Sequence, residues 1–296
     1  MRNDARATNT RNDAKPDARP DRDPSPQSSP ELRGRFGLHA IPFTREIRVE
    51  EQMHMPFADE ALDGLFNAVD QRSSAALVAP AGTGKTALLR RLLAQLPEAR
   101  YQVRYVKVTS LSKRDMCREI SAACGIPSAG AYPFLVRGLQ ERFETCSSTE
   151  GLRPVLLLDE AHELRPDVLA ILRILTNFEM DSRLVLSVIL AGQPPLQAML
   201  AREDQQAVMR RLSHCATLRL LSRDETAAYV AHRSAIAGAM HPPFDAPSLD
   251  ALYELSRGNM RAIDQLALKS LQAAARASAD VVSSPHVLAA RKDLWL

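Results

Sequence analysis

The strongest signal in this chain of 296 residues is the stretch Ala79-Pro-Ala-Gly-Thr-Gly-Lys-Thr86. It lies between a short apolar run, AALVA at 75–79, and an amphipathic run, TALLRRLLAQL at 86–96. The first run predicts a buried strand and the second predicts a helix. A glycine-rich turn from a strand into a helix surrounds one point with backbone N–H groups and the positive end of the helix dipole. The stretch therefore predicts a phosphate-binding loop.

The residues of this loop have distinct expected roles toward a nucleotide. The expected binding positions are contiguous: Pro80, Ala81, Gly82, Thr83, Gly84, Lys85, Thr86 and Ala87. Among them, Lys85 is expected to reach the β- and γ-phosphates, and the Thr86 hydroxyl is expected to bind Mg²⁺. Ala79 stands where such loops usually begin with glycine, and its methyl group fits if its φ is negative. The alternative is a glycine-rich turn without a ligand, which the flanking strand and helix disfavour.

A second motif, VLLLDE at 155–160, follows later in the chain. Its apolar strand is expected to deliver Asp159 to the carboxyl edge of a sheet, beside the phosphate loop, where the carboxylate holds the water shell of Mg²⁺. Glu160 is expected to orient and polarise the attacking water. Two acids after a strand can instead cap the next helix. The two motifs together favour a P-loop ATPase in which another strand separates the acid strand from the phosphate loop.

Apolar strands alternate with helical segments between residues 75 and 221, and only helical segments follow. The predicted fold class is therefore α/β: a P-loop fold with a five-stranded parallel sheet between helices, followed by a small all-helical lid. The predicted strands are 75–79, 101–108, 155–159, 184–190 and 216–221. The predicted domains are a disordered polar tail at 1–33, a nucleotide-binding domain at 34–221 and the lid at 222–296. Within the lid, Ser222 and Glu225 have the spacing of a capping box.

The composition excludes several classes of protein. Apolar residues make up 45% and charged residues 25% of the chain, which is typical of a globular protein. Aromatic residues make up only 5%, too few for a stacking platform for single-stranded nucleic acid. The four cysteines form no C-x-x-C pair, so a zinc site is not expected. Residues 1–35 lack the apolar core of a secretory signal, and the apolar run after Leu184 is too short to span a bilayer, so a cytoplasmic location without membrane insertion is expected.

The chain resembles AAA+ ATPases of the group that includes the ExeA secretion ATPase and the transposition ATPases TnsC, TniB and MuB. The nucleotide motifs are specific to the superfamily, whereas LRILTNFE, AGQPPL and RGNMR are more specific to this group. The resemblance extends over about residues 36–276. It rests on these segments: FGLHAIPF (36–43), PAGTGKT (80–86), LLLDEAHEL (157–164), LRILTNFE (172–179), ILAGQPPL (189–196), RRLSHCATLRLLSRDETAAYV (210–230) and SRGNMRAID (256–264).

This resemblance implies further site residues. Gln193 matches the first sensor, which responds to the γ-phosphate, although it also fits an ordinary loop amide. Arg211 matches an arginine finger for the ATP of a neighbouring subunit; Arg210 is an alternative finger, and a solvated arginine pair is another interpretation. Arg261 matches the second sensor, which ties the lid to the phosphates. Residues 36–43 are expected to pack near the adenine or within the core. The expected catalytic set is Lys85, Glu160, Gln193 and Arg211.

Contacts with DNA are a weaker expectation. In the transposition members, loops after the second strand line the channel through which DNA passes. Lys107, Lys113 and Arg114 lie in this region and could contact phosphates, or they could be a solvated helix start. No base-reading module is evident, so binding without strong sequence preference is expected. His162 follows Asp159 in a DEAH sequence, but the other helicase motifs are missing, so a helicase is not expected.

These patterns predict an ATP-dependent homo-oligomer, a ring or a filament, with ATP and Mg²⁺ as its cofactors. It is expected to assemble on duplex DNA and to direct a transposase. One alternative is an ExeA-type accessory ATPase of secretion. The chain ends at Leu296 without the membrane anchor and the peptidoglycan-binding domain of that branch, which favours the transposition hypothesis. Another alternative is a nucleotide-gated adaptor with little turnover, against which the expected base Glu160 argues.

Overall fold

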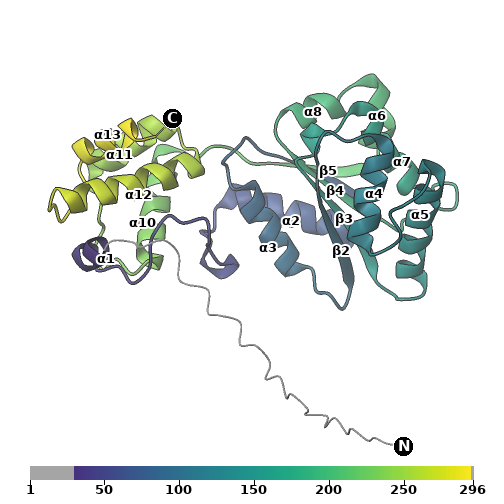
Figure 1. Ribbon diagram of the computed structural model, residues 1–296, viewed down its shortest axis with the longest axis horizontal. Coiled ribbons are helices and arrows are strands. Elements are labelled where there is room, and N and C mark those ends of the chain that lie inside the picture. The colour runs from purple at the N-terminus through teal and green to yellow at the C-terminus, as the bar shows by residue number, and fades with distance from the viewer. Residues whose placement is uncertain (1–29, 295–296) are drawn as a thin grey trace, which may run out of the picture.

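The computed structural model describes residues 30–294. These residues form an α/β part and a group of helices beside it (Figure 1). The predicted polar tail lies outside the described residues as far as residue 29. Helix α1 (Pro30–Phe36) begins within the remainder of that tail. It is helical because Leu32 and Phe36, four residues apart, are buried against the helical group. The last four tail residues, 30–33, therefore belong to the folded structure.

A single parallel sheet forms the centre of the α/β part, with strand order β2-β3-β4-β1-β5. Every residue of β1 and β4 is buried, as expected for strands covered on both faces. β4 lies between β1 and β3, which confirms the predicted separation of the acid strand from the phosphate loop. The strands are β1 (Ser74–Val78), β2 (Tyr101–Lys107), β3 (Arg153–Asp159), β4 (Ser187–Gly192) and β5 (Leu212–Thr217).

The position of the last strand was predicted wrongly. The structure has β5 at Leu212–Thr217, whereas the sequence favoured 216–221. β5 is an edge strand in which polar residues alternate with partly buried ones, so it lacks the continuous apolar pattern of a central strand. The chain leaves the sheet over the residues that follow β5. Leu218 still donates a hydrogen bond to the Val78 carbonyl, whereas Leu221 packs in the helical group.

Helices cover both faces of the sheet (Figure 1). One face packs against α2 (Pro56–Asp70) and α3 (Lys85–Gln95). The opposite face packs against a larger set: α4 (Lys113–Cys124), α5 (Tyr132–Ser148), α6 (Pro166–Leu169), α7 (Ile171–Leu175), α8 (Pro195–Leu200) and α9 (Gln206–Met209). The helix predicted at 166–177 is two short helices, and the one predicted at 204–212 ends earlier because Leu212 opens β5. Short 3-10 turns, η1 (Val49–Glu51), η2 (Ala161–Glu163) and η3 (Glu203–Gln205), complete the described elements.

The lid comprises α10 (Arg223–Ile236), α11 (Ala246–Ser256), α12 (Met260–Arg276) and α13 (Ser284–Lys292). The predicted capping box is present at the start of α10. The Glu225 backbone N–H donates to Ser222 Oγ at 3.2 Å, and the Ser222 N–H donates to Glu225 at 2.8 Å. A contact that the sequence did not reveal is that Phe43 and Met55, from the N-terminal segment, join the apolar core of the lid. The lid is thus stabilised by residues from both ends of the chain.

Two further observations concern the predicted exclusions. Within residues 30–294, no helix combines the length and apolarity needed to cross a membrane. The four cysteines are free thiols, and Cys117, Cys124 and Cys146 are buried. No group of three or more His, Cys, Asp or Glu side chains in this described range is arranged to hold a metal ion.

Candidate nucleotide-binding site

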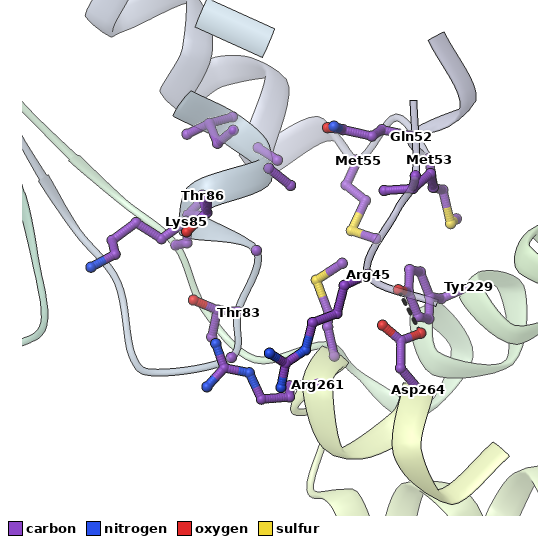
Figure 2. A pocket seen from close by; sticks show the side chains of 18 of the residues that line it. Arg45, Gln52, Met53, Met55, Thr83, Lys85, Thr86, Tyr229, Arg261 and Asp264 are labelled. Carbon is purple, nitrogen blue, oxygen red and sulfur yellow. Dashed lines mark hydrogen bonds between the residues drawn. The ribbon is translucent and has the colours of Figure 1, made fainter. Parts of the chain in front are cut away.

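A cavity of about 550 Å³ lies between the α/β part and the lid. Three segments line most of it: the loop at 80–87, the N-terminal segment at 43–58, and one face of α12 at 260–268. Figure 2 shows the first at one end, with Thr83, Lys85 and Thr86, and the lid residues Tyr229 and Asp264 at the other. All eight loop residues predicted to bind a nucleotide line this cavity.

The backbone of the loop has the conformation that an anion site requires. Gly82 and Gly84 have φ values of 78° and 89°, in the left-handed region that side chains strain. Gly84 is the N-cap of α3 and has no side chain to cap it, so the N–H groups of the first helical turn remain available to an anion. Thr83 Oγ1 closes the turn by donating to the Pro80 carbonyl at 2.8 Å. Ala79 is buried and its φ is not positive, so its methyl group fits as expected.

The two sequence motifs meet at Lys85. Its Nζ lies 3.1 Å from Asp159 Oδ1 and 2.9 Å from Glu160 Oε1. Lys85 and Asp159 are buried, so this pairing is weakly screened by solvent. Glu160 itself has φ 57°, a backbone conformation that costs energy in a residue with a side chain and that is typical of functional sites. The backbone N–H of Glu160 donates to Asp159 Oδ1 at 2.8 Å, which restrains the Asp159 carboxylate.

Tyr105 is a site neighbour that sequence reasoning missed. Its hydroxyl donates to Asp159 Oδ2 at 3.2 Å, from the adjacent strand β2. Burial and the neighbouring Asp159 carboxylate raise the pKa of Tyr105 to about 12, so the phenol stays protonated and remains a donor. The signal available in the sequence was its place near the carboxyl end of a strand that pairs with the acid strand.

Gln193 and His162 connect the acids to the end of β4. Gln193 lines the cavity, and its Nε2 lies 2.9 Å from His162 Nε2. His162 Nδ1 in turn lies 3.5 Å from Glu160 Oε2. The DEAH sequence that contains this histidine was not expected to mark a helicase, and the sequence assigned His162 no other role. The structure places it between the predicted base and the predicted first sensor, where it can transmit a change at one to the other.

The lid contacts the phosphate loop directly. Asn259 Nδ2 donates to the Ala81 carbonyl at 2.7 Å, and the backbone N–H of Arg261 donates to the Gly82 carbonyl at 3.2 Å. Asn259 also caps α12, through a hydrogen bond from Ala262 N to its Oδ1 at 3.2 Å. The fit is close, because a Cβ added at Gly82 would lie 2.3 Å from Asn259 Oδ1.

In Figure 2 the side chain of Arg261 extends toward Thr83 of the loop, and that of Arg45, which also lines the cavity, extends toward the same region. Arg45 was not predicted from the sequence, because it comes from the N-terminal segment and lines the same cavity as α12 only in the folded chain. Of the segment at 36–43, Phe43 lines the cavity, whereas Phe36 and Leu38 are buried in the lid core.

Comparison with known proteins agrees with this geometry. Residues 69–200 match the family of AAA domains. The chain thus has the P-loop NTPase fold, and its part at 69–200 is similar to AAA domains. A relative named general secretion pathway protein A, from Aeromonas hydrophila, is 35% identical over 262 residues, which are 86% of this chain and 47% of that protein. The chain thus spans about half the length of this curated relative.

Solved structures share the fold of the AAA+ domain and lid. Cdc6p of Pyrobaculum aerophilum has a TM-score of 0.65 at 19% identity, covering 85% of this chain and 70% of its own. The ORC1 protein of Aeropyrum pernix, solved in complex with DNA, has a TM-score of 0.62 at 20% identity, covering 85% and 68%. The Holliday junction branch migration motor RuvB of Thermotoga maritima has a TM-score of 0.56 at 17% identity, covering 85% and 73%. At these identities the likeness establishes the fold only.

The two candidate fingers lie away from the cavity of their own AAA+ domain. Arg211 precedes β5, and its Nη2 pairs with Asp181 Oδ1 at 2.6 Å. Arg210 is exposed. Neither lines the cavity, so a role in hydrolysis would require the cavity of a neighbouring subunit.

The predicted DNA-contact residues also lie outside the cavity. Lys107, Lys113 and Arg114 are all exposed, at the end of β2 and the start of α4. Lys113 Nζ lies 4.0 Å from Asp167, and Arg114 Nε donates to the Gly130 carbonyl at 3.0 Å. These partners leave the cationic groups accessible to solvent and to a polyanion.

Proposed function

We propose that this chain binds and hydrolyses ATP in the cavity between its AAA+ domain and lid, and that the nucleotide controls how the lid meets the phosphate loop. The observation that carries the proposal is the convergence of Lys85, Asp159 and Glu160, from two distant motifs, beside a glycine loop with anion-binding geometry. The direct hydrogen bonds from Asn259 and Arg261 to that loop supply the route to the lid.

The residues present suit a magnesium–ATP complex. The N–H groups at the start of α3 and the Lys85 ammonium bind phosphate oxygens, and the Thr86 hydroxyl and Asp159 carboxylate are oxygen ligands of the kind that Mg²⁺ takes. When bound, Mg²⁺ neutralises charge on the β- and γ-phosphates. Glu160 accepts a proton from the attacking water, and Gln193, held by His162, faces the same space.

Efficient turnover is proposed to require assembly. Arg211 does not reach the cavity of its own chain, so we assign it to the ATP of an adjacent subunit. A trans arginine acts mainly on the charge that develops in the transition state. Its ion pair with Asp181 holds the guanidinium in place until a neighbour docks. Ring and filament arrangements both satisfy this requirement.

For the process that the ATPase serves, a secretion role is the leading proposal. The supporting observation is the 35% identity over 86% of this chain to general secretion pathway protein A. The chain covers 47% of that protein, so the role of the whole relative is extended here by analogy. In this proposal the nucleotide cycle drives an accessory step of secretion.

The second candidate is a transposition regulator that assembles on duplex DNA and directs a transposase. It is supported by the exposed cations Lys107, Lys113 and Arg114 near the carboxyl edge of the sheet. One or two phosphate contacts in each subunit suffice when an assembly repeats them along the duplex.

Two measurements distinguish these candidates: ATP turnover with and without duplex DNA, and duplex binding with and without nucleotide. A labelled duplex of about 60 base pairs is followed by polarisation at several salt concentrations, with an ATP analogue or with ADP. A transposition regulator binds in an ATP-dependent, length-dependent and steeply salt-dependent manner. In that case Lys113→Ala with Arg114→Ala lowers DNA affinity, whereas the control pair Arg291→Ala with Lys292→Ala does not. No ATP-dependent binding at low salt rejects the DNA role and leaves the secretion role.

A further inference from the structure

Three polar side chains of the lid form a buried cluster at the end of the cavity away from the phosphate loop. Tyr229 Oη donates to Asp264 Oδ1 at 2.9 Å, and Arg233 Nη1 donates to Tyr229 Oη at 2.8 Å. Arg233 Nη1 also lies 3.3 Å from Asp264 Oδ1. All three residues line the cavity. The mechanism proposed above does not use them, so their position in the cavity wall calls for a separate explanation.

Two members of this cluster, Tyr229 and Arg233, use their polar groups in hydrogen bonds within the protein. Tyr229 and Arg233 are 3% and 6% exposed. Arg233 Nη2 donates to the Thr44 carbonyl at 2.6 Å, which ties the N-terminal segment to the lid. Arginine has no acceptor atom, and the Tyr229 hydroxyl already donates to Asp264. Neither side chain therefore offers a ligand in the cavity an acceptor as strong as a carboxylate.

Asp264 differs because only one of its carboxylate oxygens accepts a short hydrogen bond. Oδ1 accepts from Tyr229, whereas Oδ2 has a single longer contact, 3.4 Å from Arg233. Its side chain keeps 20% of its exposure. In Figure 2 the dashed bond joins one oxygen to Tyr229, and the other oxygen points into the cavity. Burial raises the pKa of Asp264 to about 6, so the carboxylate is mostly ionised at pH 7 and acts as an acceptor.

The position of Asp264 along α12 indicates which part of a nucleotide it would face. Arg261, Asp264 and Leu268 lie on one face of the helix and all line the cavity. Arg261 lies at the end of this helix face nearer the phosphate loop, because its backbone N–H donates to the Gly82 carbonyl. At 1.5 Å per residue, Asp264 lies about 4.5 Å further along the helix axis. The cavity wall also includes apolar side chains suited to a flat base: Phe43, Met53, Met55 and Met260.

We propose that Asp264 accepts a hydrogen bond from the nucleoside of the bound nucleotide and so determines nucleotide selectivity. The inference rests on the proposed ATP binding and extends it to a residue outside the phosphate and acid motifs. An adenine nucleoside offers two kinds of donor to a carboxylate oxygen, the exocyclic amine of the base and the hydroxyls of the ribose. Both have the chemistry that this oxygen requires.

The test measures dissociation constants of the wild-type chain for four nucleotides by calorimetry. They are ATP, purine riboside triphosphate, which lacks the amine, and the 2′-deoxy and 3′-deoxy forms of ATP. We expect about tenfold weaker binding of the one analogue that lacks the bonded donor, and near-equal binding of the other two. The affected analogue identifies the source of the donor. This series needs no variant, so it holds even if substitution at Asp264 impairs folding.

Asp264→Asn then tests the residue itself. In this variant the amide oxygen is retained by the two donors Tyr229 and Arg233, so the NH₂ group faces the cavity and cannot accept. The preference for ATP over the affected analogue should disappear. Asp250→Asn, the same change in a lid residue outside the cavity, should preserve it.

The outcomes separate this inference from the function on which it rests. Equal weakening of all four nucleotides by Asp264→Asn means that Asp264 only supports the lid, and it overturns the inference. Tight ATP binding by the wild-type chain without discrimination among the analogues overturns it as well, while the proposed function stands. If the wild-type chain binds none of the nucleotides, the proposed function fails together with the inference.

Discussion

Lys85 is the residue at which the two motifs of the site act on each other. Its ammonium lies within 3.1 Å of Asp159 and 2.9 Å of Glu160, and its side chain is only 10% exposed. Two carboxylates next to a phosphate site would repel the phosphates if no cation lay between them. The same ammonium therefore has to compensate the acids and to bind the nucleotide, which makes the site sensitive to its loss.

Lys85→Ala is expected to weaken ATP binding at least tenfold, equivalent to about 1.4 kcal/mol or more. The reason is twofold, since the variant loses a phosphate contact and leaves the two carboxylates unbalanced. Calorimetric titration with ATP and Mg²⁺ measures the change. Lys113→Ala, which removes an exposed lysine outside the cavity, is the control and should bind ATP like the wild type. An unchanged affinity in Lys85→Ala would remove the basis for assigning the loop.

Asn259 connects two elements, because it caps α12 with Oδ1 and binds the phosphate loop with Nδ2. Asn259→Ser separates these roles, since serine retains the capping oxygen but is too short to reach Ala81. We expect ATP affinity to fall severalfold while the thermal unfolding midpoint stays within a few degrees of wild type. Asn259→Ala should lower both, as the cap contributes about 1 kcal/mol. Wild-type affinity in Asn259→Ser would show that this lid contact does not influence the site.

The ion pair of Glu225 with Arg219 at the start of α10 makes lid stability depend on pH. A hydrogen bond from Arg219 is the main cause that lowers the pKa of Glu225 to about 2, from 4.5. A carboxyl whose pKa is lowered by folding stabilises the fold above its unfolded pKa, and this contribution disappears as the pH falls from 4.5 toward 2. Glu225→Gln should therefore lower the unfolding temperature at pH 7 and make little difference near pH 2. Asp224→Asn, in the same helical turn, is the control, and an equal effect of the two substitutions would refute the explanation by the Arg219–Glu225 pair.

The elements that could be predicted were those with local signals. Strands β1 and β3 are apolar and end at motifs, and α10 begins at a capping box, so their sequences identify them. β5 was misplaced because an edge strand with alternating polar residues lacks that signal. Tyr105, Arg45 and Asp264 were missed for another reason. Their neighbours come from segments far apart in the chain, and a sequence without its fold does not indicate which polar residues will meet at one site.

Considered as a whole, the molecule places its cavity between parts that come from both ends of the chain. The N-terminal segment joins the lid core through Phe36 and Phe43, and Arg233 binds Thr44. The sequence assigned Phe36, Phe43 and Thr44 to the nucleotide-binding domain at 34–221 and did not predict their association with the lid. Arg211, by contrast, does not line this cavity and pairs with Asp181. One subunit thus contains the candidate cavity, but its candidate finger lies outside that cavity.

Arg211→Ala should leave ATP binding by the single subunit nearly intact and suppress hydrolysis in the assembly. Mixing Arg211→Ala with Glu160→Gln subunits should restore part of the turnover, because some junctions then combine an intact finger with an intact base. Phosphate release assays on mixtures with confirmed co-assembly measure the recovery. A mixture no more active than either variant would argue against a shared site.

The most direct test of an ATP-hydrolysing site at the edge of this sheet is Glu160→Gln, with binding and turnover measured on the same preparation. The amide retains the shape of the side chain but cannot take a proton from water, so we predict ATP affinity close to wild type and turnover reduced by roughly 10²-fold or more. Glu141→Gln, an exposed acid on α5, should turn over ATP normally. Wild-type turnover in Glu160→Gln would contradict the assignment and would make Glu160 a structural residue.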